Sequence, residues 1–475
     1  MASQPQPAAA SLRPSVHAAF LAAYFRELDR RGVRYCITRN FERLPDEIDG
    51  DVDILVRPGQ RARAEAALDD ALPGHFVVRR VERDGHLLVF ITSAEELRSA
   101  TREGRAAAVV EIDLVTQLAW SGLHYQNAIG VLSRARERAG SWVAHPADEA
   151  AHVLCHAILD KNQVKPGYRA VLERACQQLG DVAFEPLERC AGAGIVARLR
   201  EVSASGDDAS LLALRSDLIR ALITRRPLGL LRFAAHHASV AARRVRAVLQ
   251  PPGVLIATAG PDGAGKSTLL AQLGSVLDEI YHPIRDQYMG WRDFVLPTKK
   301  LLGWLQRTLA ARKSPDATAA AAAASAVPEP EYSHEPEGPM SWTHNFSVLH
   351  YFADLFARYV LQIRPALHRG GLVLCDRYFF DVLVQEVWIC ESPIPRALLV
   401  ALTPRPTVTA LLSGDAEVIA ARKREISPER TTDQMQSLSV LSGSKGVLAL
   451  DALKPLDENV EAVLKQLFPS WSEAR

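Results

Sequence analysis

The stretch VLIATAGPDGAGKSTLLAQLGSVLDEI, residues 254–280, decides the fold of the C-terminal half of this chain. Its first six residues, VLIATA, form a short, mainly apolar run that predicts a buried strand. Residues 260–267 match the pattern G-x4-G-K-[ST], and the residues that follow have the apolar spacing of a helix. A strand, a glycine-rich turn and a helix in this order predict a phosphate-binding loop within an α/β fold.

Each residue type in this loop suits the binding of a nucleoside triphosphate. Glycines let the backbone curl so that successive N–H groups point at phosphate oxygens, and the helix N-terminus adds partial positive charge. We expect Lys266 to bridge the β- and γ-phosphates of ATP and Ser267 to bind Mg²⁺. The expected phosphate-binding residues are Gly260, Gly263, Gly265, Lys266, Ser267 and Thr268.

A second apolar run ends in charged residues that fit the same site. LVLC, residues 372–375, predicts a buried strand and is followed directly by Asp376 and Arg377. A carboxylate at the C-terminal end of a parallel strand opens onto the crevice where such folds bind ligands. We therefore expect Asp376 to hold Mg²⁺ through water and Arg377 to face phosphate.

A basic segment follows another strand-like run, TVTALLS at residues 407–413. Within residues 416–432, Arg422 and Arg424 are the arginines that we expect to close over the transferring phosphoryl group. A solvated helix end of mixed charge is the alternative interpretation of the same residues.

Together, GPDGAGKST, the later DRY and the basic segment resemble the thymidylate kinase family of nucleoside monophosphate kinases. The resemblance covers roughly residues 253–468. It implies a five-stranded parallel sheet, Mg-ATP as the phosphate donor and a phosphorylated acceptor opposite the loop. It also implies that Asp262 contacts a sugar hydroxyl of the acceptor, and that Ala353 and Asp354 lie on an acceptor-side helix.

The chain departs from this family where the acceptor's base is read. The family's Arg-Glu-Pro-Gly stretch is missing, and residues 285–291 read RDQYMGW instead. The family pattern DR[YF]xxSxxAYQ continues here as DRYFFDVLVQ, with Asp381 in place of the serine and Gln385 one position early. We therefore expect a divergent kinase that phosphorylates a nucleoside monophosphate or a sugar or glycan-precursor acceptor, with dTMP as the alternative.

The N-terminal part carries a separate set of carboxylates. Asp51 and Asp53 alternate along a strand-like run, so their side chains share one face, and Asp113 lies in a second run, VVEIDLV at 109–115. Three converging carboxylates are what two-metal nucleotidyl transfer requires. We therefore expect Asp51, Asp53 and Asp113 to bind metal ions.

Residues 20–120 resemble the polymerase-β-type nucleotidyltransferase superfamily in this arrangement. The superfamily's Gly-Ser or Gly-Gly turn is absent, and Thr38-Arg39-Asn40 stands in its place. Active transfer with Arg39 compensating triphosphate charge is one interpretation, and a binding or degenerate module is the other. Further on, His152, His156 and Asp160 share a helical face, which is consistent either with a metal site or with polar packing.

The expected organisation is an α/β multidomain protein with a helical middle segment. It comprises a disordered N-terminus at 1–15, a small mixed-sheet nucleotidyltransferase-like domain at 16–125, a helical segment and basic linker at 126–250, and a P-loop kinase domain at 251–475 with a mobile insertion at 314–340.

Composition limits the classes of partner and compartment. The net charge of +1 gives no reason to expect nucleic acid, and six cysteines without a CxxC pair fit reduced thiols in the cytoplasm. Residues 215–250 carry eight arginines and a single acidic residue, which suits an anionic membrane surface, an acidic neighbouring domain or a solvated connector. The chain is also expected to form a homodimer.

Two functions from different classes follow from these patterns. The first is an ATP- and Mg²⁺-dependent phosphotransferase fused to a nucleotidyltransferase-like domain. The second is a nucleotide-binding switch or recruitment protein whose N-terminal domain is degenerate.

Overall fold

The computed structural model describes the chain in two compact units. The described residues are 16–48, 50–72, 76–83, 85–225, 228–289, 352–380, 401–422 and 427–468. Unit 1 comprises Met1–Leu97, Ala108–Arg246 and Ser470–Arg475, and unit 2 comprises Arg98–Ala107 and Ala247–Pro469. The expected disordered terminus at 1–15, the insertion at 314–340, and Asp381, Gln385 and Arg424 lie outside the described residues.

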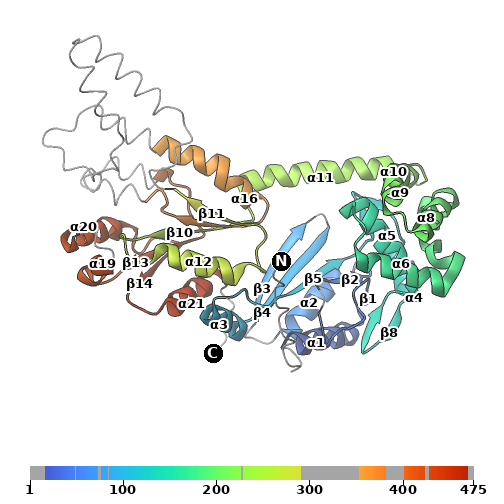
Figure 1. Cartoon of the computed structure of the whole chain (residues 1–475), viewed down its shortest axis with the longest axis horizontal. Helices are drawn as coiled ribbons and strands as arrows, with labels where there is room; N and C mark the ends of the chain where they lie inside the picture. The colour runs from blue at the N-terminus through green and yellow to red at the C-terminus, as the bar shows by residue number, and fades with distance from the viewer. Residues whose placement is uncertain are drawn as a thin grey trace, which may run out of the picture. The chain divides into compact units, whose positions relative to one another are not determined.

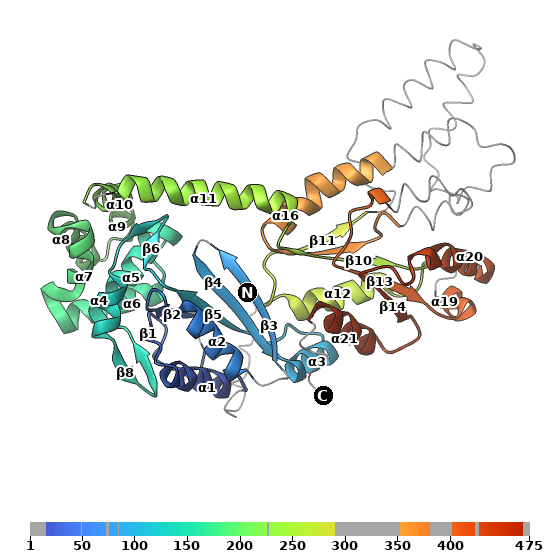
Figure 2. The same ribbon diagram turned by 180° about the vertical axis from the view of Figure 1, so that it is seen from behind.

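Unit 2 is built on a five-stranded parallel sheet, as Figures 1 and 2 show. The strands are β10 (Val254–Ala259), β11 (Ile284–Tyr288), β12 (Leu372–Asp376), β13 (Val408–Ser413) and β14 (Val447–Asp451), in the order β11-β12-β10-β13-β14. All four neighbouring pairs are parallel. The expectation of a five-stranded parallel sheet in the C-terminal half is therefore confirmed.

Helices cover both faces of this sheet, which is why its central strands are mostly buried and apolar. Figure 1 shows α12 (Lys266–Leu277) and α21 (Leu456–Leu467) on one side and the segment Tyr359–His368 on the other. The sheet order changes direction at β10, because β11 and β12 lie on one side of it and β13 and β14 on the other. In such sheets, ligands bind outside the carboxyl ends of the strands at this switch point.

Unit 1 contains a seven-stranded mixed sheet in the order β3-β4-β5-β2-β1-β9-β8. The strands are β1 (Tyr35–Ile37), β2 (Val52–Val56), β3 (Phe76–Arg83), β4 (His86–Ser93), β5 (Val110–Val115), β8 (Arg136–Arg138) and β9 (Ser141–Val143); β6 (Ala119–Trp120) and β7 (Leu123–His124) form a separate hairpin. The pairs β2–β5 and β1–β9 are parallel, and the other pairs in the sheet are antiparallel. Strands β8 and β9 lie after residue 125, within the range that the sequence suggests is helical.

Two apolar cores lie on opposite faces of this sheet because side chains alternate along each strand. Val52, Ile54 and Val56 pack with α1 (Val16–Arg30) and α2 (Arg61–Ala71). Leu55, on the other face, packs with the helices that follow the sheet. Asp53 shares the face of Leu55 by this alternation, so it faces the helical segment.

A series of helices follows the sheet of unit 1, from residue 146 to residue 249. Its elements are α5 (Pro146–Cys155), a π-helical turn (His156–Lys161), α6 (Pro166–Leu179), a 3₁₀ turn (Gly180–Phe184), α7 (Glu185–Ala191), α8 (Ala193–Ser205), α9 (Asp208–Ala213), α10 (Arg215–Thr224) and α11 (Gly229–Leu249). The last residues of α11 belong to unit 2. Among the described residues, no helix combines the length and apolar character needed to cross a membrane.

Candidate functional site

The glycine-rich loop lies at the carboxyl end of the central strand of unit 2. Strand β10 ends at Ala259, and α12 begins at Lys266. Gly260, Gly263 and Gly265 have positive φ angles of 154°, 89° and 89°. A Cβ atom at Gly260 would lie 2.8 Å from the carbonyl oxygen of Leu412, so a side chain at this position would require the backbone to move.

Lys266 is held over the loop by acceptors of the loop itself. Its Nζ donates to the carbonyl oxygens of Gly260 at 2.9 Å and Pro261 at 2.8 Å, and it lies 3.4 Å from Oδ1 of Asp262. The Lys266 side chain is 8% exposed. Two of these partners are neutral carbonyl groups, so a phosphate group could replace them and gain a full charge interaction.

Ser267 and Asp376 meet across the ends of α12 and β12. The Ser267 hydroxyl donates to Oδ2 of Asp376 at 2.5 Å. The Thr258 hydroxyl lies 3.5 Å from the other carboxylate oxygen. Hydroxyl and carboxylate oxygens are the donors that Mg²⁺ prefers, so this pair fits the metal ion that the family resemblance implies.

Arg377 bonds to the carboxylate of the loop. Its Nη2 donates to Oδ1 of Asp262 at 2.5 Å, and the two side chains are 15% and 8% exposed. Arg377 has a φ angle of 58°, an unfavourable conformation for a residue with a side chain. The expectation named both residues but missed their contact, because it joins positions 115 residues apart.

A small hollow opens beside these groups. It is lined by Thr258, Ala259, Gly260, Lys266, Arg377, Phe380 and Leu438. The two cationic side chains suit an anionic ligand, and Phe380 and Leu438 supply an apolar wall. Nothing in the sequence singles out Leu438, which comes from α20 (Pro428–Leu438).

Of the two arginines expected to close over the transferring phosphoryl group, the structure describes Arg422. Arg422 ends α19 (Ala416–Arg422), and its Nη1 donates to the carbonyl oxygen of Ala452 at 2.9 Å. This contact joins the end of α19 to the turn after β14. The closing role of Arg422 stays a prediction.

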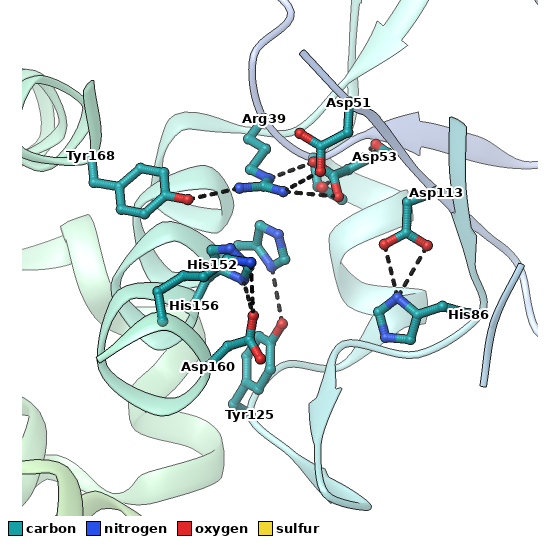
Figure 3. Close-up of polar contacts among 12 residues, drawn as sticks. Arg39, Asp51, Asp53, His86, Asp113, Tyr125, His152, His156, Asp160 and Tyr168 are labelled. Atoms are coloured by element: carbon teal, nitrogen blue, oxygen red, sulfur yellow. Dashed lines mark hydrogen bonds and ion pairs between the residues drawn. The ribbon is translucent and has the colours of Figure 1, made fainter. Parts of the chain in front are cut away.

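In unit 1, Arg39 lies between the two carboxylates of the β2 run (Figure 3). Its guanidinium donates to both oxygens of Asp53 and, at 2.8 Å, to Oδ2 of Asp51. Its Nη1 donates to the Tyr168 hydroxyl at 3.0 Å. The Arg39 and Asp53 side chains are both more than nine-tenths buried, whereas Asp51 is partly exposed.

The third expected carboxylate lies next to this group. The parallel register of β2 and β5 pairs Asp53 with Asp113. His86 Nδ1 lies 2.8 Å and 3.0 Å from the two carboxylate oxygens of Asp113. Burial raises the pKa of Asp53 to about 7, and Asp51 and Asp113 add to this rise, while Arg39 opposes it.

Two histidines from the helical segment complete the cluster. His152 Nδ1 lies 3.1 Å from the Tyr125 hydroxyl, and the rings of His152 and His156 are 6.2 Å apart. His156 Nδ1 lies 3.5 Å from Asp160. Burial, and then the positive charge of Arg39, lower the pKa of both imidazoles, that of His156 to about 4. Both are therefore neutral at pH 7.

This cluster contains the three carboxylates that are expected from the sequence to bind metal ions. Among the described residues, no group of three or more His, Cys, Asp or Glu side chains has an arrangement that could hold a metal ion. Arg39 supplies the positive charge between Asp51 and Asp53. Metal binding by Asp51, Asp53 and Asp113 therefore stays a prediction. Such binding requires Arg39 to move away from Asp51 and Asp53.

The sequence did not reveal two partners of this cluster. Tyr168 belongs to α6, 129 residues after Arg39, and His86 begins β4. Both are common residue types without a motif around them. Only the register of the strands brings His86 to Asp113, and only the packing of α6 brings Tyr168 to Arg39.

Comparisons with known proteins give a partial similarity. No protein-family model matches the chain. A probable thymidylate kinase from Archaeoglobus fulgidus is 29% identical over 111 residues, which are 22% of this chain and 57% of that protein. The chain thus spans little more than half the length of this curated relative.

A structural comparison adds a second similarity of limited weight. The crystal structure of thymidylate kinase from Ehrlichia chaffeensis aligns with 45% of this chain and 98% of that one, at 16% identity and a TM-score of 0.29. A score this low carries no argument about the fold. The sequence comparison therefore relates about a fifth of the chain to a probable thymidylate kinase. These comparisons give no support to the nucleotidyltransferase resemblance of residues 20–120.

Proposed function

We propose that unit 2 is an ATP- and Mg²⁺-dependent phosphotransferase of the thymidylate-kinase type. The observation that carries the proposal is the meeting of Lys266, Ser267 and Asp376 at the carboxyl ends of β10 and β12. A basic side chain, a hydroxyl and a carboxylate around a glycine-rich loop are the groups that phosphoryl transfer requires.

Each group has a defined task in this proposal. The loop amides and the N-terminus of α12 bind the phosphates, and Lys266 turns from the carbonyls of Gly260 and Pro261 to the phosphate oxygens. Ser267 and Asp376 hold the metal ion, which neutralises the charge that develops on the transferring group. Ser267 and Asp376 already lie next to each other, so only Lys266 has to change partners when the phosphates bind.

The acceptor site is proposed around the Asp262–Arg377 pair. Asp262 lies beside both Lys266 and Arg377, at the edge of the hollow lined by Phe380. In this position it suits an acceptor hydroxyl as a hydrogen-bond acceptor. We propose a nucleoside monophosphate or a sugar or glycan-precursor as the acceptor class.

A metabolite panel tests this proposal. Nucleoside monophosphates, including dTMP, and sugar phosphates are incubated with the protein, ATP and Mg²⁺, and products are detected by the mass of one added phosphoryl group. One phosphorylated product is expected. Slow ATP hydrolysis without any phosphorylated product would assign the protein to the nucleotide-dependent switches instead.

Asp376→Asn is expected to lower the rate with the accepted substrate by at least about a hundredfold, because a neutral amide binds Mg²⁺ poorly. The rate is measured over a range of Mg²⁺ concentrations. Asp278→Asn removes an exposed carboxylate at the opposite end of α12 and serves as the control, which should keep full activity. An equal loss in both variants would show that Asp376 has no special role.

As a second candidate function, we propose that unit 1 binds a nucleoside triphosphate with its metal ion. The pairing of Asp53 with Asp113 across β2 and β5, with Asp51 two residues earlier, supports this proposal. Oxygen donors of this kind suit Mg²⁺, and the release of Arg39 from Asp51 and Asp53 would let it face the triphosphate.

Asp51→Asn/Asp53→Asn is expected to weaken Mg²⁺-dependent nucleotide binding to unit 1 by at least about tenfold. The measurement is equilibrium dialysis in a Lys266→Ala background, where the loop of unit 2 contributes little. Asp69→Asn/Asp70→Asn, which removes two exposed carboxylates from α2, is the control. Nucleotide binding that is unchanged by the double substitution, or that needs no metal ion, would remove support for this site.

A further inference from the structure

Helix α11 of unit 1 exposes a continuous apolar face. The face consists of Leu231, Ala234, Ala235, Ala238, Ala242 and Val245, and each of these residues is exposed. Their spacing follows the helical repeat, so all six lie along one side of the helix. Leu231 and Val245, the bulky residues at its two ends, are 63% and 65% exposed. We call this set the outer face of α11.

The opposite side of α11 is anchored within unit 1. Phe233 packs against Trp120 of the β6–β7 hairpin, with ring centroids 6.4 Å apart. A Cβ atom at Gly122 would lie 2.8 Å from the carbonyl oxygen of Arg232, so the helix backbone passes directly over this turn. These contacts fix the rotation of the helix, and the outer face points away from the hairpin because the helical repeat places it opposite Phe233.

The outer face is bordered by positive charge. Arg246 lies at one edge of this face and Arg232 lies farther round the helix on the same side, and both are exposed. No acidic residue occurs between Gly229 and Leu249. Exposed Leu228 and Leu230 extend the apolar surface at the start of the helix.

The apolar outer face and the arginines beside it limit which kind of partner can cover this surface. A second copy of the helix would bring arginines against arginines with no carboxylate to pair with them. A neutral apolar partner would leave the arginines without counter-charges at its border. The occupant must therefore offer apolar depth along a strip and negative charge beside it. The acyl region and the headgroups of an anionic lipid bilayer provide both.

We propose that α11 docks unit 1 on the surface of an anionic membrane, with its outer face in the headgroup–acyl boundary. The helix lies in the plane of the membrane and does not cross it. Arg232 and Arg246 then contact lipid phosphates. This role goes beyond phosphoryl transfer, because it would bring the whole chain to a lipid surface.

Vesicle co-sedimentation of the full chain tests the proposal. The probes are phosphatidylcholine vesicles with and without phosphatidylglycerol. The chain is expected to bind the anionic vesicles, with binding that weakens as salt concentration rises, and to leave neutral vesicles unbound. Leu231→Glu/Val245→Glu should weaken binding by at least about a hundredfold, since it places charges in the apolar boundary.

A control variant tests whether a loss of vesicle binding comes from the outer face itself or from added negative charge in general. Ile129 and Val182 are apolar side chains of unit 1 with 60% and 52% exposure, far from α11 in sequence. Ile129→Glu/Val182→Glu adds the same two negative charges and should keep vesicle binding. Arg232→Ala/Arg246→Ala should lower binding to anionic vesicles by about thirtyfold.

Three results would overturn the proposal. The first is absence of binding to anionic vesicles by the unaltered chain. The second is equal binding by the unaltered chain and by Leu231→Glu/Val245→Glu, provided that thermal unfolding shows both to be folded. The third is a lipid-free dimer, seen by light scattering, that dissociates in this variant, because the outer face would then join two copies of the chain.

Discussion

Lys266→Ala is expected to lower the rate of phosphoryl transfer by at least about a hundredfold while unit 2 keeps its fold. The ammonium group of Lys266 is one of two cations lining the hollow beside the loop, and the carbonyls of Gly260 and Pro261 hold it there next to Asp262. Removal of a preorganised charge of this kind lowers kcat by about 10²- to 10³-fold. The measurement is the initial rate with the acceptor found in the metabolite panel.

The control for this prediction is a lysine of the same unit outside the site. Lys454 is exposed in the turn after β14, so Lys454→Ala changes the net charge equally. Its rate should match that of the unaltered chain. Thermal unfolding of Lys266→Ala should change little, because Asp262 keeps its contact with Arg377. Full activity in Lys266→Ala would remove the loop from the mechanism.

Arg39→Met is expected to destabilise the protein by about 3–5 kcal/mol at pH 8, because it leaves buried carboxylates without their cation. Asp53 accepts two contacts from Arg39 and is more than nine-tenths buried. Urea unfolding measures the loss. Arg220→Met, which removes a highly exposed arginine, should change the free energy of unfolding by less than about 1 kcal/mol.

The pH dependence of this effect has a definite sign. The folded-state pKa of Asp53 is raised to about 7, above its value in an unfolded chain, so the folded state binds the extra proton. The contribution of Asp53 to stability is therefore greatest at low pH and is lost as pH rises from about 4 to 7. Without Arg39 this pKa rises further, so Arg39→Met should cost less at pH 5 than at pH 8.

A second substitution tests the same explanation. Asp53→Asn removes one of the two charges that Arg39 neutralises, so Arg39→Met/Asp53→Asn should recover part of the lost stability at pH 8. No recovery, together with an equal loss at pH 5 and pH 8, would mean that Arg39 contributes packing alone.

Local patterns predicted the elements around the loop well. The run 254–259 is β10 residue for residue, LVLC lies within β12, and TVTALLS contains β13. Short apolar runs bounded by glycine, proline and charged residues are read from the chain without knowledge of its partners. The number and direction of the strands in unit 2 came from the family resemblance.

Contacts between distant positions could not be predicted in this way. The pairing of Arg377 with Asp262 depends on the order of strands in the sheet, and that of Arg39 with Tyr168 depends on the packing of α6. A motif specifies residue types, whereas the packing of the folded chain determines which charged side chains contact and neutralise one another. The sequence therefore indicated carboxylates at Asp51 and Asp53 without revealing that an arginine joins them.

Hydrogen–deuterium exchange tests the central claim most directly, because it reports on the loop amides themselves. The peptide covering residues 260–268 is followed with and without Mg-ATP, in the unaltered chain and in Lys266→Ala. Our account predicts slower exchange of this peptide with Mg-ATP in the unaltered chain and little change in the variant. Unchanged exchange of residues 260–268 at a concentration where Mg-ATP is bound would contradict it, because the phosphates would then lie elsewhere.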